Sequence, residues 1–162
     1  MIQVQKAVNA DSRSANSNFN IKTLETDTRK HINDVSKGLD FISTEIFKRG
    51  VFHDNTKLSF MDQFYDALKS NNVKSSFWYN MHITTERHHL KSNPPEDVNL
   101  IDVIEHLVDC TMAGLTRSGT IYDIDLPSEL LQKAIANTVE LLKNNIHVVD
   151  SNGGNDNVNN AD

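Results

Sequence analysis

Apolar residues recur every three or four positions along most of this chain, which is the period of a helix with one buried face. The longest such stretch runs roughly from Leu24 to Arg49, with Gly50 placed to end it. Its apolar stripe is expected to be buried and consists of Ile32, Val35, Leu39, Ile42 and Ile46. His31 lies next to that stripe, four residues before Val35, so its side chain can also face inward.

The same period predicts further helices, separated by clear breaks. Their expected limits are a helix capped by Asn55-Thr56 and ending at Ser70–Asn72, a helix over Ser75–His89, a helix that starts at Asp97 or Asn99 and frays at Gly114 and Gly119, and a helix from Pro127-Ser128 to near Asn145. No alternating strand pattern recurs, although a short strand within Ile2–Val8 stays open. We therefore expect an all-α bundle of five or six helices.

The two ends of the chain are polar. Residues 1–20 are rich in Asn and Ser, and we expect a mobile or loosely docked arm there. Residues 21–149 then form the helical domain. Residues 150–162 are mostly Asn, Gly and Asp and supply no core residues, which predicts a disordered acidic tail.

Composition narrows the class of partner. The formal net charge is -6 and no run of Lys or Arg appears, so long nucleic acid is a poor fit for this chain. A lone Cys110 excludes an internal disulfide and agrees with a reducing compartment. No apolar run approaches the ~20 residues of a membrane helix, and residues 1–20 lack the apolar core of a secretory signal. We expect a cytoplasmic protein without a membrane partner, and its oligomeric state stays open.

Histidines and acids follow one another in an order that favours a metal site. His53 and Asp54 are adjacent, His31 precedes them and Asp109 follows on a later helix. Imidazole nitrogen and carboxylate oxygen are ligands of the divalent metals that support hydrolysis. We expect His31, His53, Asp54 and Asp109 to hold one ion. An isolated His-Asp pair is more often a capped turn, His31 could be a core histidine, and Asp109 could be a buried cap, although burying an aspartate is costly unless it is paired or binds a metal.

A second group of histidines follows the first. His82, Glu86 and His89 would share one helical face, and His88 lies off that face unless the helix has ended. We expect two of the three histidines, His82 with His88 or His89, to hold a second ion, with Asp54 bridging the pair. Glu86 and Glu105 are expected to support the ligands from behind, and for Glu105 a ligand or a surface acid stays open.

Two cations complete the candidate site. Lys57 lies one turn after Asp54, where it could contact a phosphate oxygen or stabilise a leaving group, so Lys57 and Asp54 are the candidate catalytic residues. Arg87 is a weaker candidate for binding substrate. The alternative for Lys57 is a solvated helix residue.

The order His31, His53-Asp54, Asp109 resembles the H…HD…D signature of the HD-domain superfamily of metal-dependent phosphohydrolases. The run from His53 to Lys57 is similar to the HDxxK form of HD-GYP-like and related members, where the Lys lies at the catalytic centre. Residues 82–89 resemble the extra histidine pair of binuclear members, and residues 103–109 the closing helix that delivers the last Asp. The resemblance covers about residues 28–116 and extends to small HD-like proteins of phages and bacteria with no assigned role.

This resemblance implies an all-α phosphohydrolase that cleaves a phosphomonoester or phosphodiester through metal-activated water. It implies one or two divalent ions (Mn, Fe, Co, Ni, Zn or Mg), a small substrate such as a nucleotide, and the host cytoplasm for a phage-encoded chain. No GYP segment follows His89 and no acid follows Asp54 at the spacing of the nucleotidase branch, so neither specificity is carried over. The alternative is a non-catalytic HD-like protein that keeps a metal and senses a nucleotide or serves as an interaction module.

Overall fold

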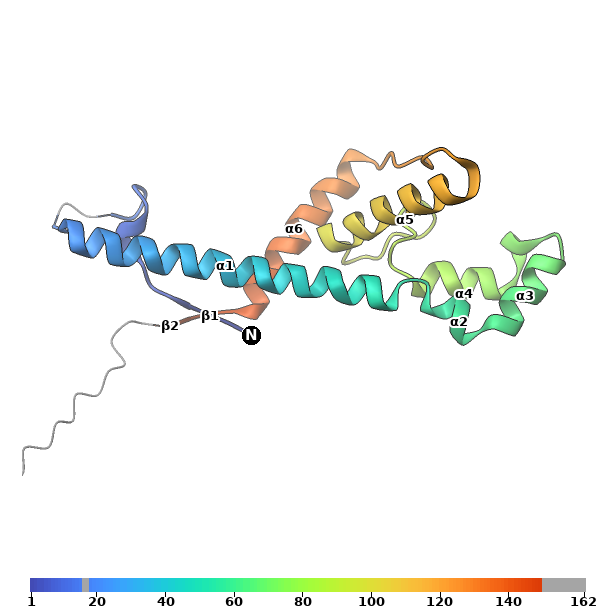
Figure 1. Ribbon diagram of the computed structural model, residues 1–162, viewed down its shortest axis with the longest axis horizontal. Coiled ribbons are helices and arrows are strands. Elements are labelled where there is room, and N and C mark those ends of the chain that lie inside the picture. Colours follow the sequence, from blue (N-terminus) through green and yellow to red (C-terminus); the bar gives the residue numbers. More distant parts are fainter. Residues whose placement is uncertain (16–17, 150–162) are drawn as a thin grey trace, which may run out of the picture. The chain divides into compact units, whose positions relative to one another are not determined.

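The computed structural model describes residues 1–15 and 18–149, and within them the chain is predominantly helical (Figure 1). The elements in chain order are β1 (Ile2–Gln5), η1 (Val8–Ala10), α1 (Ile21–Phe52), α2 (Asn55–Ser59), α3 (Met61–Lys69), η2 (Val73–Ser75), α4 (Phe77–Thr85), α5 (Leu100–Ser118), α6 (Ser128–Asn145) and β2 (Ile146–Val149). The expected all-α class is confirmed. The tail expected to be disordered, residues 150–162, lies outside the described residues. Among the helices of the described chain, none has both the length and the apolar character that crossing a bilayer requires.

The chain divides into two compact units. Unit 1 contains residues 1–41 and the chain from Leu142 onward, and unit 2 contains residues 42–141. The expected helical domain over residues 21–149 therefore spans both units, and the unit boundaries fall inside α1 and α6.

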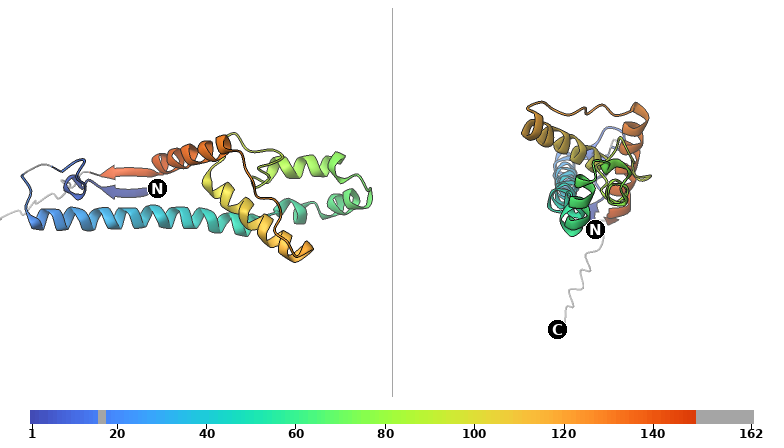
Figure 2. Two further views of the ribbon diagram at one scale, coloured as in Figure 1. Left: turned by 90° about the horizontal axis from the view of Figure 1, so that it is seen from above. Right: turned by 90° about the vertical axis from the view of Figure 1, so that its right-hand side faces the viewer.

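Unit 1 contains a small parallel sheet of two strands. β1 pairs with β2, with Ile2 opposite Ile146 (Figure 2, left). The segment expected to be a loose arm therefore begins with a strand, and a strand also follows the last helix, which the sequence pattern did not indicate. Polar side chains of α1 hold β1: the Gln5 N–H donates to Asp34 at 2.7 Å, and Lys37 donates to the Gln3 carbonyl at 2.7 Å.

Helix α1 differs from its prediction in two ways. It continues past Gly50 to Phe52, so the glycine does not end it. Its apolar stripe was also expected to be buried, whereas Ile32 and Leu39 are 62% and 65% exposed. In unit 1 the hydrogen bonds from α1 to β1 come from its polar face, through Asp34 and Lys37, and not from the apolar stripe.

The segment after α1 is more broken than the sequence pattern indicated. Asp54 lies in the left-handed region at φ 55° and precedes α2, so it occupies the cap position that Asn55-Thr56 was expected to fill. The single helix predicted through Phe60 is two helices, α2 and α3, separated at Phe60. The helix predicted over Ser75–His89 ends at Thr85, because Glu86 adopts an extended backbone. His88 and His89 consequently lie in the turn that follows α4.

The core of unit 2 lies between α5, α6 and the loop that precedes α5. Its buried members are Leu90, Val98, Val103 and Ala134. Asn99 begins α5 with a capping box, in which its side chain accepts backbone N–H groups and Asp102 accepts the Asn99 N–H at 3.0 Å. Asn99 was one of the two expected starts. Gly119 ends the helix at φ 75°.

Gly114, which was expected to lie in the fraying end of this helix, is instead inside it. A Cβ there would collide with the backbone of Thr120 and Tyr122, so the glycine permits close packing of the loop that follows α5.

Candidate metal centre

Six side chains from three separate parts of unit 2 meet at one place. They come from the turn after α1, from α4 with the turn that follows it, and from α5. We call them the His/Asp cluster: His53, Asp54, His82, His88, His89 and Asp109. All six were candidate metal ligands, with only one of His88 and His89 expected to bind. Their proximity depends on the turns, because the left-handed backbone of Asp54 and the end of α4 at Thr85 both redirect the chain at the cluster.

The carboxylate of Asp54 lies in the middle of the cluster. Its Oδ1 is 3.5 Å from Nε2 of His82 and 3.6 Å from Nε2 of His88. Its Oδ2 is 3.5 Å from Nε2 of His53 and forms an ion pair with Lys57. The Oδ1 atom is buried and accepts no hydrogen bond from the described residues. A buried carboxylate oxygen of this kind is destabilising unless a cation or a donor satisfies it.

The other members complete a set of closely spaced donor atoms. Nε2 of His53 is 3.4 Å from Oδ1 of Asp109, and Nε2 of His89 is 2.9 Å from Nε2 of His82. Ligand atoms within 4.8 Å of one another define three overlapping groups in the described chain: His53, His88 and Glu105; Asp54, His88 and His89; His53, Asp54 and Asp109. Imidazole nitrogens and carboxylate oxygens at such spacing suit Zn²⁺, Fe²⁺, Mn²⁺ or a related ion.

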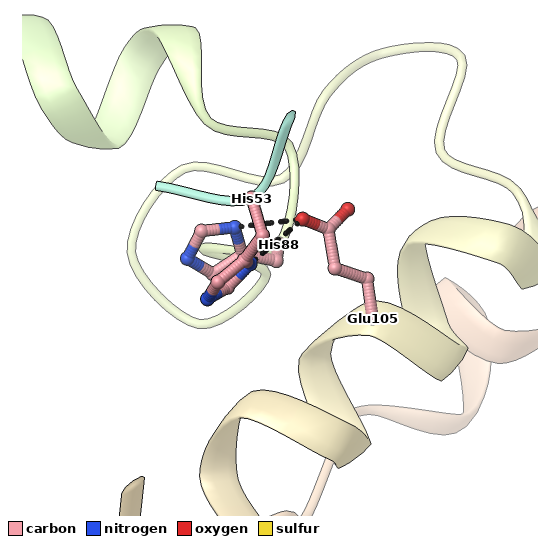
Figure 3. Close-up of side chains that lie close together, drawn as sticks. All are labelled: His53, His88 and Glu105. Atoms are coloured by element: carbon pink, nitrogen blue, oxygen red, sulfur yellow. Dashed lines mark hydrogen bonds and ion pairs between the residues drawn. The ribbon is translucent and has the colours of Figure 1, made fainter. Parts of the chain in front are cut away.

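The carboxylate of Glu105 contacts the Nδ1 atoms of two histidine rings. Its Oε1 lies 3.0 Å from Nδ1 of His53 and 3.2 Å from Nδ1 of His88, so one carboxylate from α5 faces both rings (Figure 3). An ionised carboxylate only accepts, so Nδ1 of His53 carries a proton toward Glu105, and the Nε2 atoms of both rings face the cluster. This geometry favours the supporting role expected for Glu105 over a role as metal ligand.

A second carboxylate supports His82 through a hydroxyl. Thr56 is buried, and both its N–H and its Oγ1 donate to Oε1 of Glu86, at 2.8 and 2.6 Å. Because the hydroxyl proton is used in this way, Oγ1 accepts from Nδ1 of His82, which lies 2.7 Å away. Nε2 of His82 then has the lone pair, which accepts a hydrogen bond from Nε2 of His89 at 2.9 Å. Trp78 also stacks on the His82 ring, at 4.8 Å between centroids.

The electrostatics of the cluster fall into two patterns. Contacts with Asp109 and Glu105 raise the pKa of His53 to about 10. The same contact with His53 lowers the pKa of Asp109 to about 2. Burial, together with the neighbouring His88 and His82, lowers the pKa of His89 to about 4, and burial also lowers the pKa of His82. At neutral pH His53 is therefore a cation between acids, whereas His82 and His89 are neutral.

His31, also expected to be a ligand, belongs to none of the three ligand groups found among the described residues, and its side chain is exposed. It lies in unit 1, whereas the six cluster residues lie in unit 2, so a role for His31 at the metal stays a prediction.

Three other expected residues can now be placed. Lys57 contacts Asp54 and is partly exposed, at the edge of the cluster. Glu86 lies behind His82 as expected, although it contacts the ring only through Thr56 and does not share a helical face with His82 and His89, because α4 has already ended.

Arg87 is engaged elsewhere. Its guanidinium donates to both oxygens of the fully buried Asp102, at 2.8 and 2.7 Å, and to Asp97 at 2.9 Å. These bonds attach Arg87 to the start of α5. They leave few of its N–H donors for the substrate-binding role that the sequence suggested.

Sequence reasoning missed Thr56 as a functional residue. It was interpreted only as a helix cap, and the signal that could have identified it is its position two residues after Asp54, in the same turn. A cavity of about 400 Å³ lies next to this residue. Its walls include Thr56, Glu86 and Glu105, together with Arg49 and Phe52, and none of the six cluster residues. The cavity therefore borders the Nδ1 side of the histidines.

We compared the chain with protein-family models, curated proteins and solved structures, and none of them matches it.

Proposed function

We propose that this protein is a metal-dependent phosphohydrolase of the HD type that acts on a nucleotide or another small phosphoester. One feature supports this most directly: both oxygens of Asp54 face Nε2 atoms of histidines, and Oδ1 is buried without a hydrogen bond from the described residues. An ion placed among these atoms would satisfy the oxygen and the lone pairs together. The donor set therefore fits a divalent metal.

The residues of the cluster would hold and orient that metal. When bound, a divalent ion polarises a phosphoryl oxygen and lowers the pKa of water. Glu105 and Thr56 keep the Nε2 atoms of His53 and His82 directed at the cluster, and Lys57 lies at its exposed edge. Its ammonium can pair with a phosphate oxygen and so bind the substrate and stabilise negative charge on it. Asp54 and Lys57 are thus the residues to which we assign the catalytic roles.

The substrate class depends on the HD resemblance. Most of the cluster agrees with that resemblance, since the adjacent His53-Asp54 pair, the downstream histidines and the late Asp109 lie together. Nucleotides and related small phosphoesters are the substrates that it implies. The acidic net charge of the chain agrees with a small substrate rather than a long nucleic acid.

Metal analysis combined with a substrate screen tests this function. Metal content would be measured on the purified protein, and phosphate release would then be followed from a panel of nucleotides and dinucleotides with Mn²⁺, Fe²⁺, Co²⁺ and Ni²⁺. We expect turnover with at least one metal and its loss in Asp54→Asn, with the helical circular dichroism retained. Bound metal without turnover of any phosphoester in the panel would contradict the proposed enzymatic activity.

The second candidate is a metal-containing protein that binds a nucleotide without cleaving it. The cavity of about 400 Å³ favours it, because the size suits a small ligand and its lining includes Arg49 and Phe52 but no cluster residue. A ligand held there would not touch the metal. Equilibrium binding of nucleotides that disappears in Phe52→Ala, together with absent turnover, would identify this alternative.

A further inference from the structure

Two aromatic rings from outside the His/Asp cluster are stacked against one of its histidines. The imidazole of His82 lies on the indole of Trp78, with 4.8 Å between the ring centroids and 13° between the ring planes. Phe64 of α3 stacks on the same indole, at 4.3 Å and 21°. We call these three rings the aromatic stack. All of them belong to unit 2, and the stack connects α3 to the cluster through α4.

This contact distinguishes His82 from the other histidines of the cluster. Within the described part of the chain, the ring contacts of the other three are all with histidine rings. The indole of Trp78 fixes the plane of the His82 ring, and the hydrogen bond from its Nδ1 to Thr56 fixes the rotation of the ring within that plane. Together the two contacts direct Nε2 of His82 toward Asp54.

The indole N–H of Trp78 is not the reason for a tryptophan at this position. Trp78 is 4% exposed, and its Nε1 is buried and donates to no acceptor among the described residues. Burying an N–H without a partner is destabilising, and phenylalanine would fill much of the same space without that penalty. What tryptophan offers over phenylalanine here is the face of its ring, which attracts cations most strongly among the aromatic side chains.

A cation bound to His82 would strengthen its stacking on Trp78. A divalent ion at Nε2 draws electrons from the imidazole, so the ring acquires positive charge much as an imidazolium does. A positively charged group within about 6 Å of an indole face is attracted by the ring quadrupole, and more strongly where water is excluded. His82 is 3% exposed, so water is largely excluded from this contact. The metal-bound state therefore gains an attraction that the neutral ring lacks.

We infer that Trp78 is a positioning residue of the metal centre, which orients His82 and raises its affinity for a cation through the face of the indole. Phe64 packs against that indole and so makes α3 part of the centre. The inference rests on the metal of the proposed function but not on hydrolysis.

Fluorinated tryptophan tests the role of the indole face with little change in shape. The sequence contains one tryptophan, so protein grown on fluorinated tryptophan differs from wild type at Trp78 alone. Each added fluorine makes the ring face less negative. We expect the Co²⁺ affinity of the full-length chain, followed by visible absorption, to fall stepwise with the number of fluorines, by about fivefold overall. Thermal unfolding of the metal-free protein should change little. Equal affinity across the series would overturn the inference.

Substitutions separate the same role from simple packing. The affinity for Co²⁺ should fall more in Trp78→Leu than in Trp78→Phe, because phenylalanine keeps a weaker aromatic face. Phe64→Leu should lower the affinity by a smaller factor. Its matched control is Phe77→Leu, at an exposed neighbour of Trp78 on α4, which should bind Co²⁺ as wild type does. Wild-type affinity in both Trp78 variants would show that the indole only fills space.

The outcomes distinguish this inference from the proposed function. Co²⁺ binding that weakens across the fluorinated series, without turnover of any phosphoester, would remove only the hydrolysis. Turnover by a chain whose Co²⁺ affinity does not depend on the indole would remove only the role of Trp78. A wild-type chain that binds no Co²⁺ would overturn both.

Discussion

Acids with little exposure to solvent occur in both units, but their oxygens are satisfied in different ways. In unit 1, Asp34 accepts the Gln5 N–H and a bond from Lys37, and Asp27 accepts both the backbone N–H and the side-chain amide of Asn9. In unit 2, Asp54 faces imidazoles on both sides and keeps one buried oxygen without a hydrogen bond from the described residues. The first arrangement is complete and fastens the strand and loop before α1 to that helix. The second requires a cation, which is why we place the metal there.

The sharpest test of this comparison substitutes the same side chain in each unit. Asp54→Asn should lose the bound metal and all metal-dependent turnover, because Asn keeps the shape but not the charge, and it tolerates the left-handed backbone found at Asp54. Asp34→Asn, the matched control, should keep the metal and lose about 1 kcal/mol of folding stability. Metal analysis and thermal unfolding measure the two effects. Full metal content in Asp54→Asn would remove the cluster as a metal centre.

Substitution of Glu105 should have the next largest effect on metal binding, because one of its oxygens faces two histidines. In Glu105→Gln the neutral amide can no longer hold both Nδ1 protons as a carboxylate does, so the rings of His53 and His88 lose their common anchor. We expect metal affinity to fall by about 10- to 100-fold. Co²⁺ titration measures this, with the exposed Glu129→Gln as a control that should behave as wild type. Unchanged affinity would show that the rings are positioned by other contacts.

The sequence pattern predicted some helices well and others poorly, for a physical reason. α5 and α6 begin as expected, at Asn99 and at Pro127-Ser128, because capping chemistry is local to the chain. The stripe of α1 was expected to be buried and is largely exposed at Ile32 and Leu39. Periodicity identifies an apolar face but contains no information about what covers it.

The candidate site, like the helices, could be predicted from the sequence only in part. That His53, Asp54 and Asp109 would lie together followed from the order of residue types in the chain. The side of each ring that faces the metal could not be predicted in this way. It depends on contacts with Glu105 and Thr56, which lie elsewhere in the chain or were interpreted only as a cap, and on the left-handed backbone of Asp54, which the apolar pattern does not encode.

The pH dependence of metal binding should show which histidines hold the ion. The pKa of His53 is raised to about 10, so below that pH an ion bound at Nε2 of His53 must displace a proton, and affinity should rise by about tenfold per pH unit from neutral pH upward. The pKa values of His82 and His89 are lowered, that of His89 to about 4, so those rings are already neutral and an ion held by them alone should depend far less on pH. Calorimetry in buffers of different ionisation enthalpy measures the protons released. Binding without proton release at neutral pH would show that His53 does not ligate the ion.

Thr56 should give a smaller effect that depends on its hydroxyl. Thr56→Val preserves shape but removes the group that joins His82 to Glu86, and we expect metal affinity to fall by about tenfold. Thr56→Ser restores the hydroxyl and should recover most of that loss. Co²⁺ titration of the two variants, with nitrogen NMR shifts of His82 to report its tautomer, checks the role. If the Val and Ser variants bind metal equally well, the hydroxyl does not orient the ring.

The smallest effect is expected at His31, and it tests how far the HD resemblance extends. His31→Ala should leave metal content unchanged and alter stability by no more than about 0.5 kcal/mol, because the side chain is exposed and belongs to no ligand group. His53→Ala, the same substitution inside the cluster, should lower the metal content. Metal analysis of the two variants side by side compares the two histidines. If His31→Ala also lost metal, His31 would be a ligand as the HD resemblance implies.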